Sequence, residues 1–389
     1  MNYDFDKIVD RTGNHAAKYD ERERVFGTSD VIPLWIADMD FMTAQPIIDA
    51  LKARAGEGIW GYTSRPASYF QAIQDWQKRR NGWEPDISLI SFSPGVVQSL
   101  SAAVRNFTAE GDAVLIMPPV YPEFYDAANA WDRPILESRM LEKDGVWSVD
   151  YADLDRKLGA AKLFIFCSPH NPLGIVWTRE ELRRIGGMCL EHGVLMVSDE
   201  IHSDLVFWDK KHVNTAAVSP EIAANTITCI SGTKTFNLAG LQASAAVFPN
   251  MEMKEKFDSF WRKMDIHRNN AFSVTAMEAA FRYGDEWLDQ LLRYLEGNFL
   301  FIRDYCAENI PLVKPNVPDA TYLVWLDCRA LGLDGPALRE FMIKKAKLGL
   351  NDGSAFCPGL SGYMRLNAAC PRSVLAKALG QLKAAVDEM

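Results

Sequence analysis

The chain lacks the sequence features of several large protein classes. None of its seven cysteines stands in a C-x-x-C pair and their number is odd, so a disulfide framework is not indicated. The six histidines show no H-E-x-x-H or other metal-ligand spacing, which leaves a metal site without support. No apolar stretch reaches the roughly 18 residues that a membrane span needs, and residues 1–13 do not resemble a secretory signal. We therefore expect a cytoplasmic protein with buried free thiols.

Nucleotide-binding motifs and a basic surface are missing as well. We find no G-x-G-x-x-G between a first strand and a helix and no G-x-x-x-x-G-K-[ST] run, so a nicotinamide dehydrogenase or a P-loop enzyme is a poor interpretation. The formal net charge is -9, which disfavours nucleic acid or an anionic membrane as the main partner.

What the chain does contain is an alternation of short apolar runs with helical patterns. Its 389 residues are 48% hydrophobic and predict one large and one smaller domain. Buried strands are expected at residues 113–117, 163–167, 194–198, 226–230 and 243–248. Such runs, separated by helices, predict an α/β fold with a mostly parallel sheet covered on both faces. We place the large domain at 46–285 and assign 1–45 and 286–389 to a small α+β domain.

Polar or aromatic side chains follow these strands where each one ends. They are Tyr121, Asn171, Asp199 and Lys234. The carboxyl ends of parallel strands gather functional groups at one edge of a sheet. A lysine there is costly unless it has a role, and a desolvated amine can form an imine with a cofactor aldehyde. Each residue also has a structural interpretation. Lys234 could be an ordinary surface lysine in a loop, and Asp199 could cap a helix or form an ion pair. Asn171 could belong to an Asn-Pro turn, and Tyr121 could cover the end of the sheet.

Groups suited to phosphate lie in the same region. The hydroxyls of Ser231 and Thr233 flank the lysine. The helix expected from residue 96 offers the free N–H groups of Gly95, Val96 and Val97 at its positive end. The combination favours a phosphorylated aldehyde cofactor, although a helix start is weak evidence when taken alone.

Four longer runs carry a family resemblance over nearly the whole chain. They are SPHNPLG at 168–174, SDEIHSDL at 198–205, SGTKTFNLAGL at 231–241 and GYMRLNAACPR at 362–372. With GYT at 61–63 they resemble fold-type-I pyridoxal-phosphate (PLP) enzymes of the aminotransferase superfamily, and within it the MalY/PatB group of cystathionine β-lyase-like C–S lyases. The resemblance implies a PLP-dependent transferase-like fold with a seven-stranded sheet.

The resemblance also implies roles for individual residues. Lys234 would form the imine with PLP and later move the α-proton. Asp199 would pair with the pyridine nitrogen, and Asn171 with the ring hydroxyl and the substrate. Tyr121 would stack on the ring and belong to the catalytic residues. Arg365 would bind the substrate carboxylate with its planar fork, unless it forms a structural ion pair.

The cofactor phosphate would be held by Ser231, by Thr233 and by the amides of residues 95–97. Tyr62 would reach the phosphate and substrate from the other subunit of a homodimer, which places the active site at the subunit interface.

Two departures distinguish the chain from many aminotransferases. Gln242 stands eight residues after the lysine, where an arginine often binds phosphate, and His202 stands three residues after the aspartate in place of tyrosine. Both fit the C–S lyase group better, and His202 is expected among the cofactor-binding residues. Which group replaces the charge of the arginine stays open.

The predicted activity is cleavage of cystathionine or a related cysteine S-conjugate to a thiol, pyruvate and ammonia. The alternative is an aminotransferase acting on an L-amino acid and a 2-oxo acid, since no local motif separates the two reactions. A PLP-fold protein retained as a regulatory binding module is disfavoured by the full set of catalytic groups.

Overall fold

Seven strands form the central sheet of this computed structural model, which describes residues 1–266 and 268–389. The strand order is β2-β10-β9-β8-β7-β3-β4. The strands are β2 (Ile90–Ser93), β3 (Ala113–Ile116), β4 (Ile135–Glu137), β7 (Ala161–Cys167), β8 (Leu195–Asp199), β9 (Thr226–Ile230) and β10 (Ser244–Val247). The predicted mostly parallel, seven-stranded sheet is thus confirmed. β10 is the exception, because it runs antiparallel to both β2 and β9.

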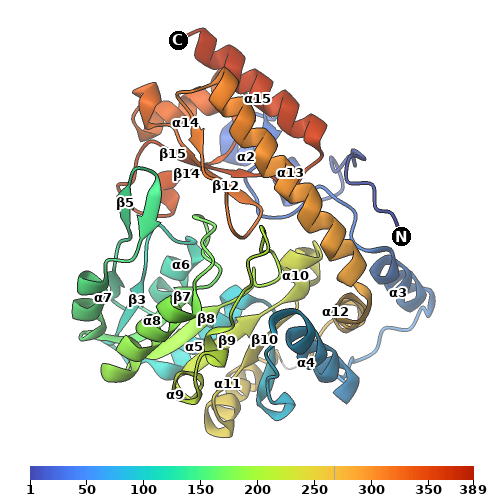
Figure 1. The fold of residues 1–389 in the computed structure, drawn as a ribbon. Coiled ribbons are helices and arrows are strands. Elements are labelled where there is room, and N and C mark those ends of the chain that lie inside the picture. The colour runs from blue at the N-terminus through green and yellow to red at the C-terminus, as the bar shows by residue number, and fades with distance from the viewer. Residues whose placement is uncertain (267) are drawn as a thin grey trace.

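Helices cover both faces of this sheet (Figure 1). One face packs on α5 (Val96–Phe107), α6 (Glu123–Asn129) and α11 (Met251–Lys263), and the other on α7 (Tyr151–Leu158), α8 (Arg179–Glu191) and α9 (Pro220–Ala223). Strand β7 shows why both faces are covered. Leu163 and Ile165 point into the first layer and Phe164 and Phe166 into the second, as the period of two in a strand requires.

Helix α8 begins where the sequence predicts. Thr178 accepts a hydrogen bond from the Glu181 amide at 3.2 Å, and the Glu181 carboxylate accepts one from the Thr178 amide at 2.8 Å. This capping box gives hydrogen-bond acceptors to two amides that would otherwise have none at the first turn of the helix. Past the other end, Gly193 adopts a φ of 64°, a conformation that favours glycine.

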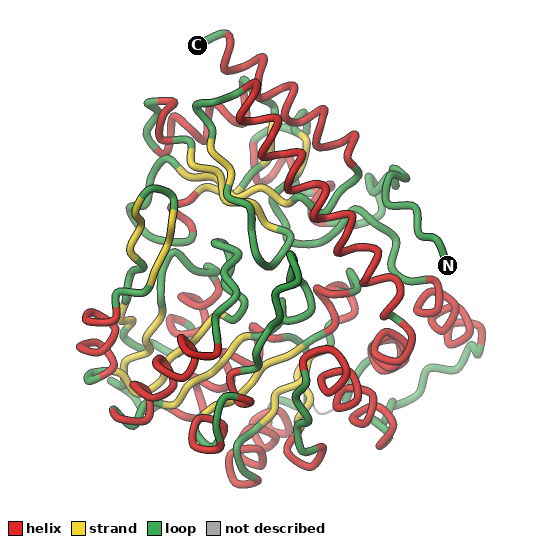
Figure 2. The backbone as a smooth tube through the Cα atoms, viewed as in Figure 1, coloured by secondary structure: helices red, strands yellow, loops and turns green. Residues whose placement is uncertain are grey.

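A second, four-stranded antiparallel sheet lies toward the C-terminus, in the order β11-β12-β15-β14 (Figures 1 and 2). Its strands are β11 (Lys314–Pro315), β12 (Leu323–Asp327), β14 (Asn351–Asp352) and β15 (Tyr363–Asn367). The accompanying helices are α14 (Gly335–Lys344) and α15 (Arg372–Asp387). The long helix α13 (Asp285–Asn309) packs against α15 and runs from the neighbourhood of α12 (Ala271–Tyr283) to this second sheet (Figure 1).

The N-terminal segment joins this second unit. It contains α1 (Ala17–Asp20), α2 (Arg22–Phe26) and β1 (Ile32–Pro33), and β1 pairs in parallel with β13 (Leu348–Gly349). Helices α3 (Gln45–Gly56) and α4 (Ala67–Asn81) then pack against α12. The short strands β5 (Leu141–Lys143) and β6 (Val146–Ser148) form a hairpin beside the second sheet.

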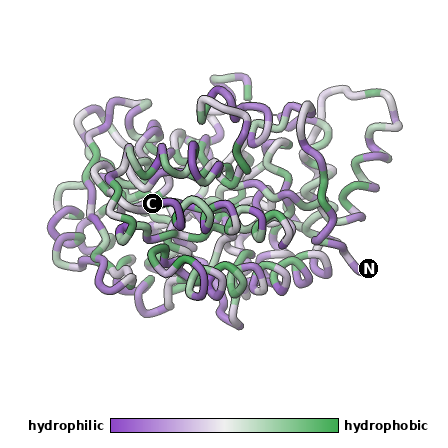
Figure 3. The backbone as a smooth tube through the Cα atoms, turned by 90° about the horizontal axis from the view of Figure 1, so that it is seen from above, coloured by the Kyte–Doolittle hydropathy of each residue, from purple (hydrophilic) through white to green (hydrophobic). Residues whose placement is uncertain are grey.

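The apolar residues of the helices are interrupted by polar ones throughout. Hydrophilic and hydrophobic residues alternate along the helical segments in Figure 3, as expected for helices that bury one face only. Within the described ranges, none of the helices combines the length and the apolar character needed to cross a bilayer.

Candidate active site

The carboxyl ends of three parallel strands bring the predicted residues together. Cys167 at the end of β7 lies beside Asp199 at the end of β8, which in turn lies beside Cys229 in β9. The segments that follow these strands line a cavity of about 220 Å³. Its wall includes Gly95, Val96, Val97, Tyr121, Asn171, Asp199, His202, Thr233 and Lys234, all of them predicted site residues.

Lys234 lies in the one-turn helix α10 (Gly232–Thr235), directly after β9. Its Nζ donates a hydrogen bond to the Ala37 carbonyl oxygen. Burial, with a smaller contribution from the charge of Arg365, lowers the pKa of Lys234 to about 8. A substantial fraction of this amine is therefore neutral near physiological pH and able to act as a nucleophile or base.

The loop around the lysine is held rigidly. Ser231 caps α10 by accepting a hydrogen bond from the Thr233 amide at 3.0 Å, and its hydroxyl donates to the Ala243 carbonyl at 2.7 Å. A Cβ on Gly232 would lie 2.8 Å from Cε of Met277, so glycine permits the close approach of α12. Buried Asp204 accepts a hydrogen bond from Thr235 at 2.7 Å and thereby fixes the residue after the lysine.

Asp199 is a buried carboxylate without a cationic partner. One oxygen accepts the Ile201 amide at 3.1 Å, and the side chain forms no ion pair with any residue that the structure describes. Burial raises the pKa of Asp199 to about 7. An isolated buried carboxylate is costly, and a cationic N–H group placed in the cavity would stabilise its charged form.

Arg365 projects from β15 of the second sheet into the same region. Its guanidinium donates to Asn171 Oδ1 at 3.2 Å, to the Trp35 carbonyl at 2.9 Å and to Asn351 Oδ1 at 2.8 Å. It also lies over the ring of Phe356, 4.7 Å from the centroid. These contacts are all with neutral groups, so the structural ion pair considered as an alternative is absent from the described residues. Burial lowers the pKa of Arg365 to about 10, and its Nε has no partner in this part of the chain.

Two ring side chains complete the polar wall. Burial and the nearby charge of Glu123 raise the pKa of the Tyr121 hydroxyl well above its usual value, so this group stays protonated. Burial, together with the charges of Lys234 and Arg365, lowers the pKa of His202 to about 3. The His202 imidazole is therefore neutral, and its Nδ1 is buried without a hydrogen-bond partner among the described residues.

The first turn of α5 opens toward the cavity. Gly95 is its N-cap and provides no side-chain cap, so the amides at this end remain available to an anion. Thr233 and Gln242 lie on the cavity wall, whereas the Ser231 hydroxyl lies beside it and bonds to Thr233 Oγ1 at 2.7 Å. The cavity therefore has an anion-binding end with neutral donors.

Tyr62 is a predicted site residue that the single chain places away from this cavity wall, at a different hollow. Its side chain is 95% exposed, lies under the guanidinium of Arg268 and borders a separate hollow with Trp60 and Phe272.

Sequence reasoning missed the main-chain contribution of the N-terminal segment. The Ala37 carbonyl accepts hydrogen bonds from Lys234 and, at 2.9 Å, from the Tyr322 hydroxyl. Asn237 fastens the same segment to the lysine loop through Met39, whose amide donates to Asn237 Oδ1 at 2.9 Å. No side-chain motif identifies a carbonyl that acts at a distance of 197 residues along the chain.

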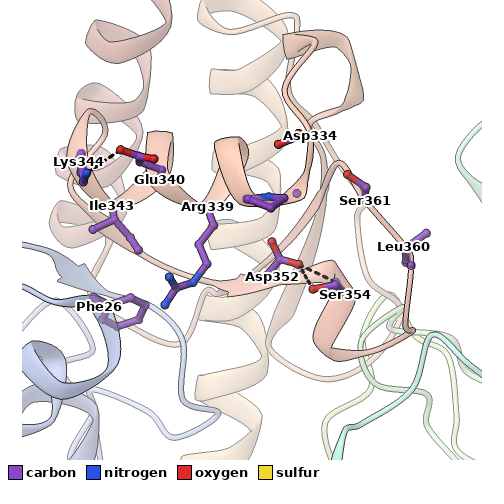
Figure 4. Close-up of a pocket in the computed structure, with 13 residues that line it drawn as sticks. Phe26, Asp334, Arg339, Glu340, Ile343, Lys344, Asp352, Ser354, Leu360 and Ser361 are labelled. Atoms are coloured by element: carbon purple, nitrogen blue, oxygen red, sulfur yellow. Dashed lines mark hydrogen bonds and ion pairs between the residues drawn. The ribbon is translucent and has the colours of Figure 1, made fainter.

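A larger hollow of about 910 Å³ lies beside α14 (Figure 4). Several of its polar groups already form hydrogen bonds with other groups of the protein. Glu340 accepts from Lys344 at 2.6 Å, Asp334 caps α14 through the Ala337 amide at 2.9 Å, and Asp352 accepts from the Ser354 amide at 2.7 Å. The smaller cavity, with its unpaired buried charges, is the better candidate for chemistry.

Comparison with known proteins agrees with this geometry. Residues 29–382 match the family model described as aminotransferase class I and II. The chain is 44% identical to cystathionine beta-lyase PatB of Bacillus subtilis, over 98% of this chain and 99% of the relative. It is 33% identical to protein MalY of Escherichia coli, over 98% of both chains. Cystalysin from Treponema denticola, which contains a pyridoxal 5'-phosphate cofactor, superimposes with a TM-score of 0.96 at 33% identity over the full length of both chains. The predicted resemblance to the MalY/PatB group is confirmed.

Proposed function

The chain belongs to the aminotransferase class I and II family, and we propose that it is a PLP-dependent carbon–sulfur β-lyase. The substrate would be cystathionine or a related cysteine S-conjugate, and the products a thiol, pyruvate and ammonia. The observation that carries this proposal is the 44% identity, over nearly the whole of both chains, to a cystathionine β-lyase.

The cavity fits PLP in three chemical respects. The uncapped first turn of α5 suits a phosphate. Asp199 forms no ion pair with a cation in the part of the chain that the structure describes, and it suits a protonated ring nitrogen. Lys234, with a pKa of about 8, suits an aldehyde. PLP, when bound, supplies this aldehyde and a ring that withdraws electrons from the substrate Cα.

We assign the remaining contacts to PLP as follows. Asn171 would bond the ring oxygen, while Tyr121 and His202 would lie against the ring. Ser231 and Thr233 would support the phosphate with the amides of residues 95–97. Thr233 is the better placed of the two hydroxyl residues, since the Ser231 hydroxyl already donates to Ala243.

Three side chains of the protein would then act on the substrate. Arg365 binds the α-carboxylate, and its fixed fork sets which bond at Cα faces Lys234. Neutral Lys234 takes the proton from Cα. The Tyr121 hydroxyl, which is protonated because burial raises its pKa, is suited to deliver a proton to the departing sulfur.

The test is to supply the purified protein with PLP and L-cystathionine and to measure thiol and pyruvate. We expect both products in equal amounts. A parallel reaction with an L-amino acid and a 2-oxo acid is the control. Stoichiometric formation of a new amino acid there, without thiol release from cystathionine, would contradict the proposal in favour of an aminotransferase.

We also propose a homodimer in which Tyr62 completes the partner's active site. The segment around it exposes Ile59, Trp60 and Tyr62 by 80%, 60% and 95%. Such an apolar stretch supports an interface with a second copy. Analytical ultracentrifugation should give twice the 43.7 kDa chain mass, and Tyr62→Ala should weaken PLP binding. A monomer with full activity would contradict this assignment.

The domain division at 46–285 and the cytoplasmic location remain part of the proposal. The second is supported by the seven cysteines, which are all free and buried.

A further inference from the structure

Tyr322 is a fully buried residue to which the reaction above gives no role. It stands directly before β12 and does not line the cavity. Its hydroxyl donates to the Ala37 carbonyl at 2.9 Å, and the same oxygen accepts a hydrogen bond from Nζ of Lys234. Two donors therefore share one main-chain acceptor, and one of them is the amine on which the proposed reaction depends.

The main chain before Tyr322 adopts a conformation that is rare for its residue type. Thr321 has a φ of 69°, in the left-handed region that β-branched residues seldom adopt. Its amide donates to the Leu205 carbonyl at 2.8 Å, and its hydroxyl accepts from the Leu323 amide at 3.1 Å. Such a conformation persists only where the surrounding structure imposes it, and it is frequent at functional sites. Here it immediately precedes the side chain that reaches Ala37.

The Ala37 carbonyl keeps its place without help from the tyrosine hydroxyl. Nδ2 of Asn367 donates to the main-chain oxygens on both sides of it, to Ile36 at 2.7 Å and to Asp38 at 2.5 Å. The Asp38 carboxylate is in turn paired with Arg11 at 2.7 Å. The hydroxyl is thus not needed to fix the carbonyl, and its effect on the lysine acts through competition for one acceptor.

Sharing the acceptor changes the chemistry of the lysine amine. A carbonyl oxygen accepts hydrogen bonds and cannot donate them, so it stabilises the charged ammonium more than the neutral amine. A second donor on the same oxygen draws on its electron density and weakens this preference. Burial raises the pKa of Tyr322 well above its usual value, so its hydroxyl stays protonated and remains a donor. The neutral form of Lys234 is favoured as a result, and its lone pair then points away from the carbonyl.

We propose that Tyr322 is a positioning residue for Lys234: its hydroxyl occupies one side of the Ala37 carbonyl and so limits how strongly that carbonyl holds the lysine amine. The ring of Tyr322 also stands edge-on to His202 of the cavity wall, with 6.1 Å between the ring centroids and 81° between the ring planes. The consequence for turnover rests on the proposed lyase function, whereas the consequence for the amine does not.

Tyr322→Phe removes the hydroxyl and keeps the ring. The cofactor-free protein is mixed with pyridoxal, which carries the aldehyde without the phosphate, at a series of pH values. The imine at Lys234 is then reduced with borohydride and quantified by peptide mapping. We expect the apparent pKa of the amine to be about 0.5–1 higher in the variant, the equivalent of one modest hydrogen bond. At pH 7 the imine should form about three- to tenfold more slowly, because less of the amine is neutral.

The titratable groups around the Lys234 amine are unchanged in this variant. They are Arg365, which lowers its pKa, Asp38, Glu123 and Asp199, which raise it, and the uncharged His202 and Tyr121 on the cavity wall. A shift of the apparent pKa can therefore be assigned to the lost hydrogen bond.

Tyr294→Phe is the matched control. The Tyr294 hydroxyl donates to Asp6 at 2.5 Å and accepts from the Arg372 amide at 2.8 Å, but it does not line the cavity. This variant should keep the wild-type pH profile. An unchanged or lowered pKa of Lys234 in Tyr322→Phe, or an equal shift in the control, would overturn the inference. Urea unfolding is measured for both variants, and a Tyr322→Phe protein that does not fold would make Tyr322 a structural residue and overturn it as well.

Turnover gives a second measurement of the same effect. In the PLP-loaded Tyr322→Phe variant, kcat for thiol release from L-cystathionine should fall about three- to tenfold at pH 7 and approach the wild-type value as the pH rises. KM should change by less than about twofold, since the contact of Arg365 with the substrate carboxylate is retained. A loss that is equal at every pH would contradict the inference. Failure of the wild type to release thiol would instead refute the lyase function and leave the result with pyridoxal intact.

Discussion

Two groups of buried or partly buried charges lie within one molecule, and they are arranged in opposite ways. In the N-terminal segment, Arg11 and Lys18 surround Asp38 and Asp40. Arg11 reaches both carboxylates at 2.7 Å, and Lys18 reaches Asp40 at 2.9 Å. These two cations and two anions neutralise one another.

In the cavity, Lys234, Asp199 and Arg365 are also buried or largely buried, yet none of the three forms an ion pair within the ranges that the structure describes. We infer that the paired charges of the N-terminal segment stabilise the fold, whereas the charges in the cavity are available to bind ligands. The paired cluster also connects the two regions, because it holds residues 38–40, next to the Ala37 carbonyl that receives Lys234.

The largest expected effect comes from removing the cavity amine. Lys234→Ala should lower kcat for thiol release by about 10²–10⁴-fold, the usual range for a lost general base. The free energy of unfolding should not fall, since a desolvated amine is removed rather than a paired one. Activity assays with urea unfolding of the cofactor-free protein would check both parts. If Lys234→Ala were unfolded, Lys234 would be required for stability, as the paired charges of the N-terminal segment are.

Breaking the paired cluster should have the converse outcome. Lys18→Met leaves Asp40 with one buried partner fewer, and we expect the free energy of unfolding to fall by about 3–5 kcal/mol. The control is Lys344→Met, which breaks the exposed pair with Glu340 and should cost at most about 1 kcal/mol. Urea denaturation measures both changes. If the free energy of unfolding fell by similar amounts in the two variants, the buried and the exposed ion pair would contribute equally to stability, contrary to this expectation.

A charge-conserving change sharpens the role of Arg365. Arg365→Lys keeps the charge but loses the planar fork, so kcat/KM should fall by roughly thirtyfold, equivalent to about 2 kcal/mol. Arg329→Lys, at an exposed arginine paired with Asp327 and Glu142, should leave kcat/KM unchanged. If Arg365→Lys had the same kcat/KM as the wild type, Arg365 would not be the group that binds the substrate carboxylate.

The smallest effect, when it is counted for each pH unit, is a pH dependence of stability. A free aspartate titrates near about pH 4, whereas burial raises the pKa of Asp199 to about 7. Between these values the folded state binds more protons than the unfolded state. The stabilisation is therefore present below about pH 4 and is lost as the pH rises through 7, with a slope of at most about 1.4 kcal/mol per pH unit.

Urea unfolding of the cofactor-free protein at a series of pH values would show this slope, and Asp199→Asn should abolish it. A difference between wild type and variant that stays constant from pH 4 to 7 would contradict the unpaired state of this carboxylate.

The sequence predicts the long, strongly apolar elements well. β9 occupies the predicted residues 226–230, and the capping box at Thr178 starts α8 as expected. The half-buried β4, with three residues, and β2, with a polar serine at alternate positions, were not predicted because their apolar signal is weak. The antiparallel direction of β10 was missed as well, since an apolar run does not encode the direction in which its strand is paired.

The groups of the candidate site likewise differ in whether the sequence predicts them. Asn171, Asp199 and Lys234, which the structure places on one cavity wall, could be predicted as candidates because each follows an apolar run whose end is recognisable in the local sequence. The Ala37 carbonyl was not found, because a main-chain oxygen looks ordinary in the sequence.

By itself, the sequence determined the strand and helix pattern and the chemical set of the cavity, because both depend on side chains that are close along the chain. Only the tertiary structure decided which charges are paired. Asp38 and Asp40 pair with Arg11 and Lys18, which lie 20 to 29 positions earlier in the chain, and Arg365 reaches Asn171 across 194 positions without forming an ion pair with any acid in the described ranges. Pairing and burial set the free energy of a charge, and both depend on contacts between distant segments.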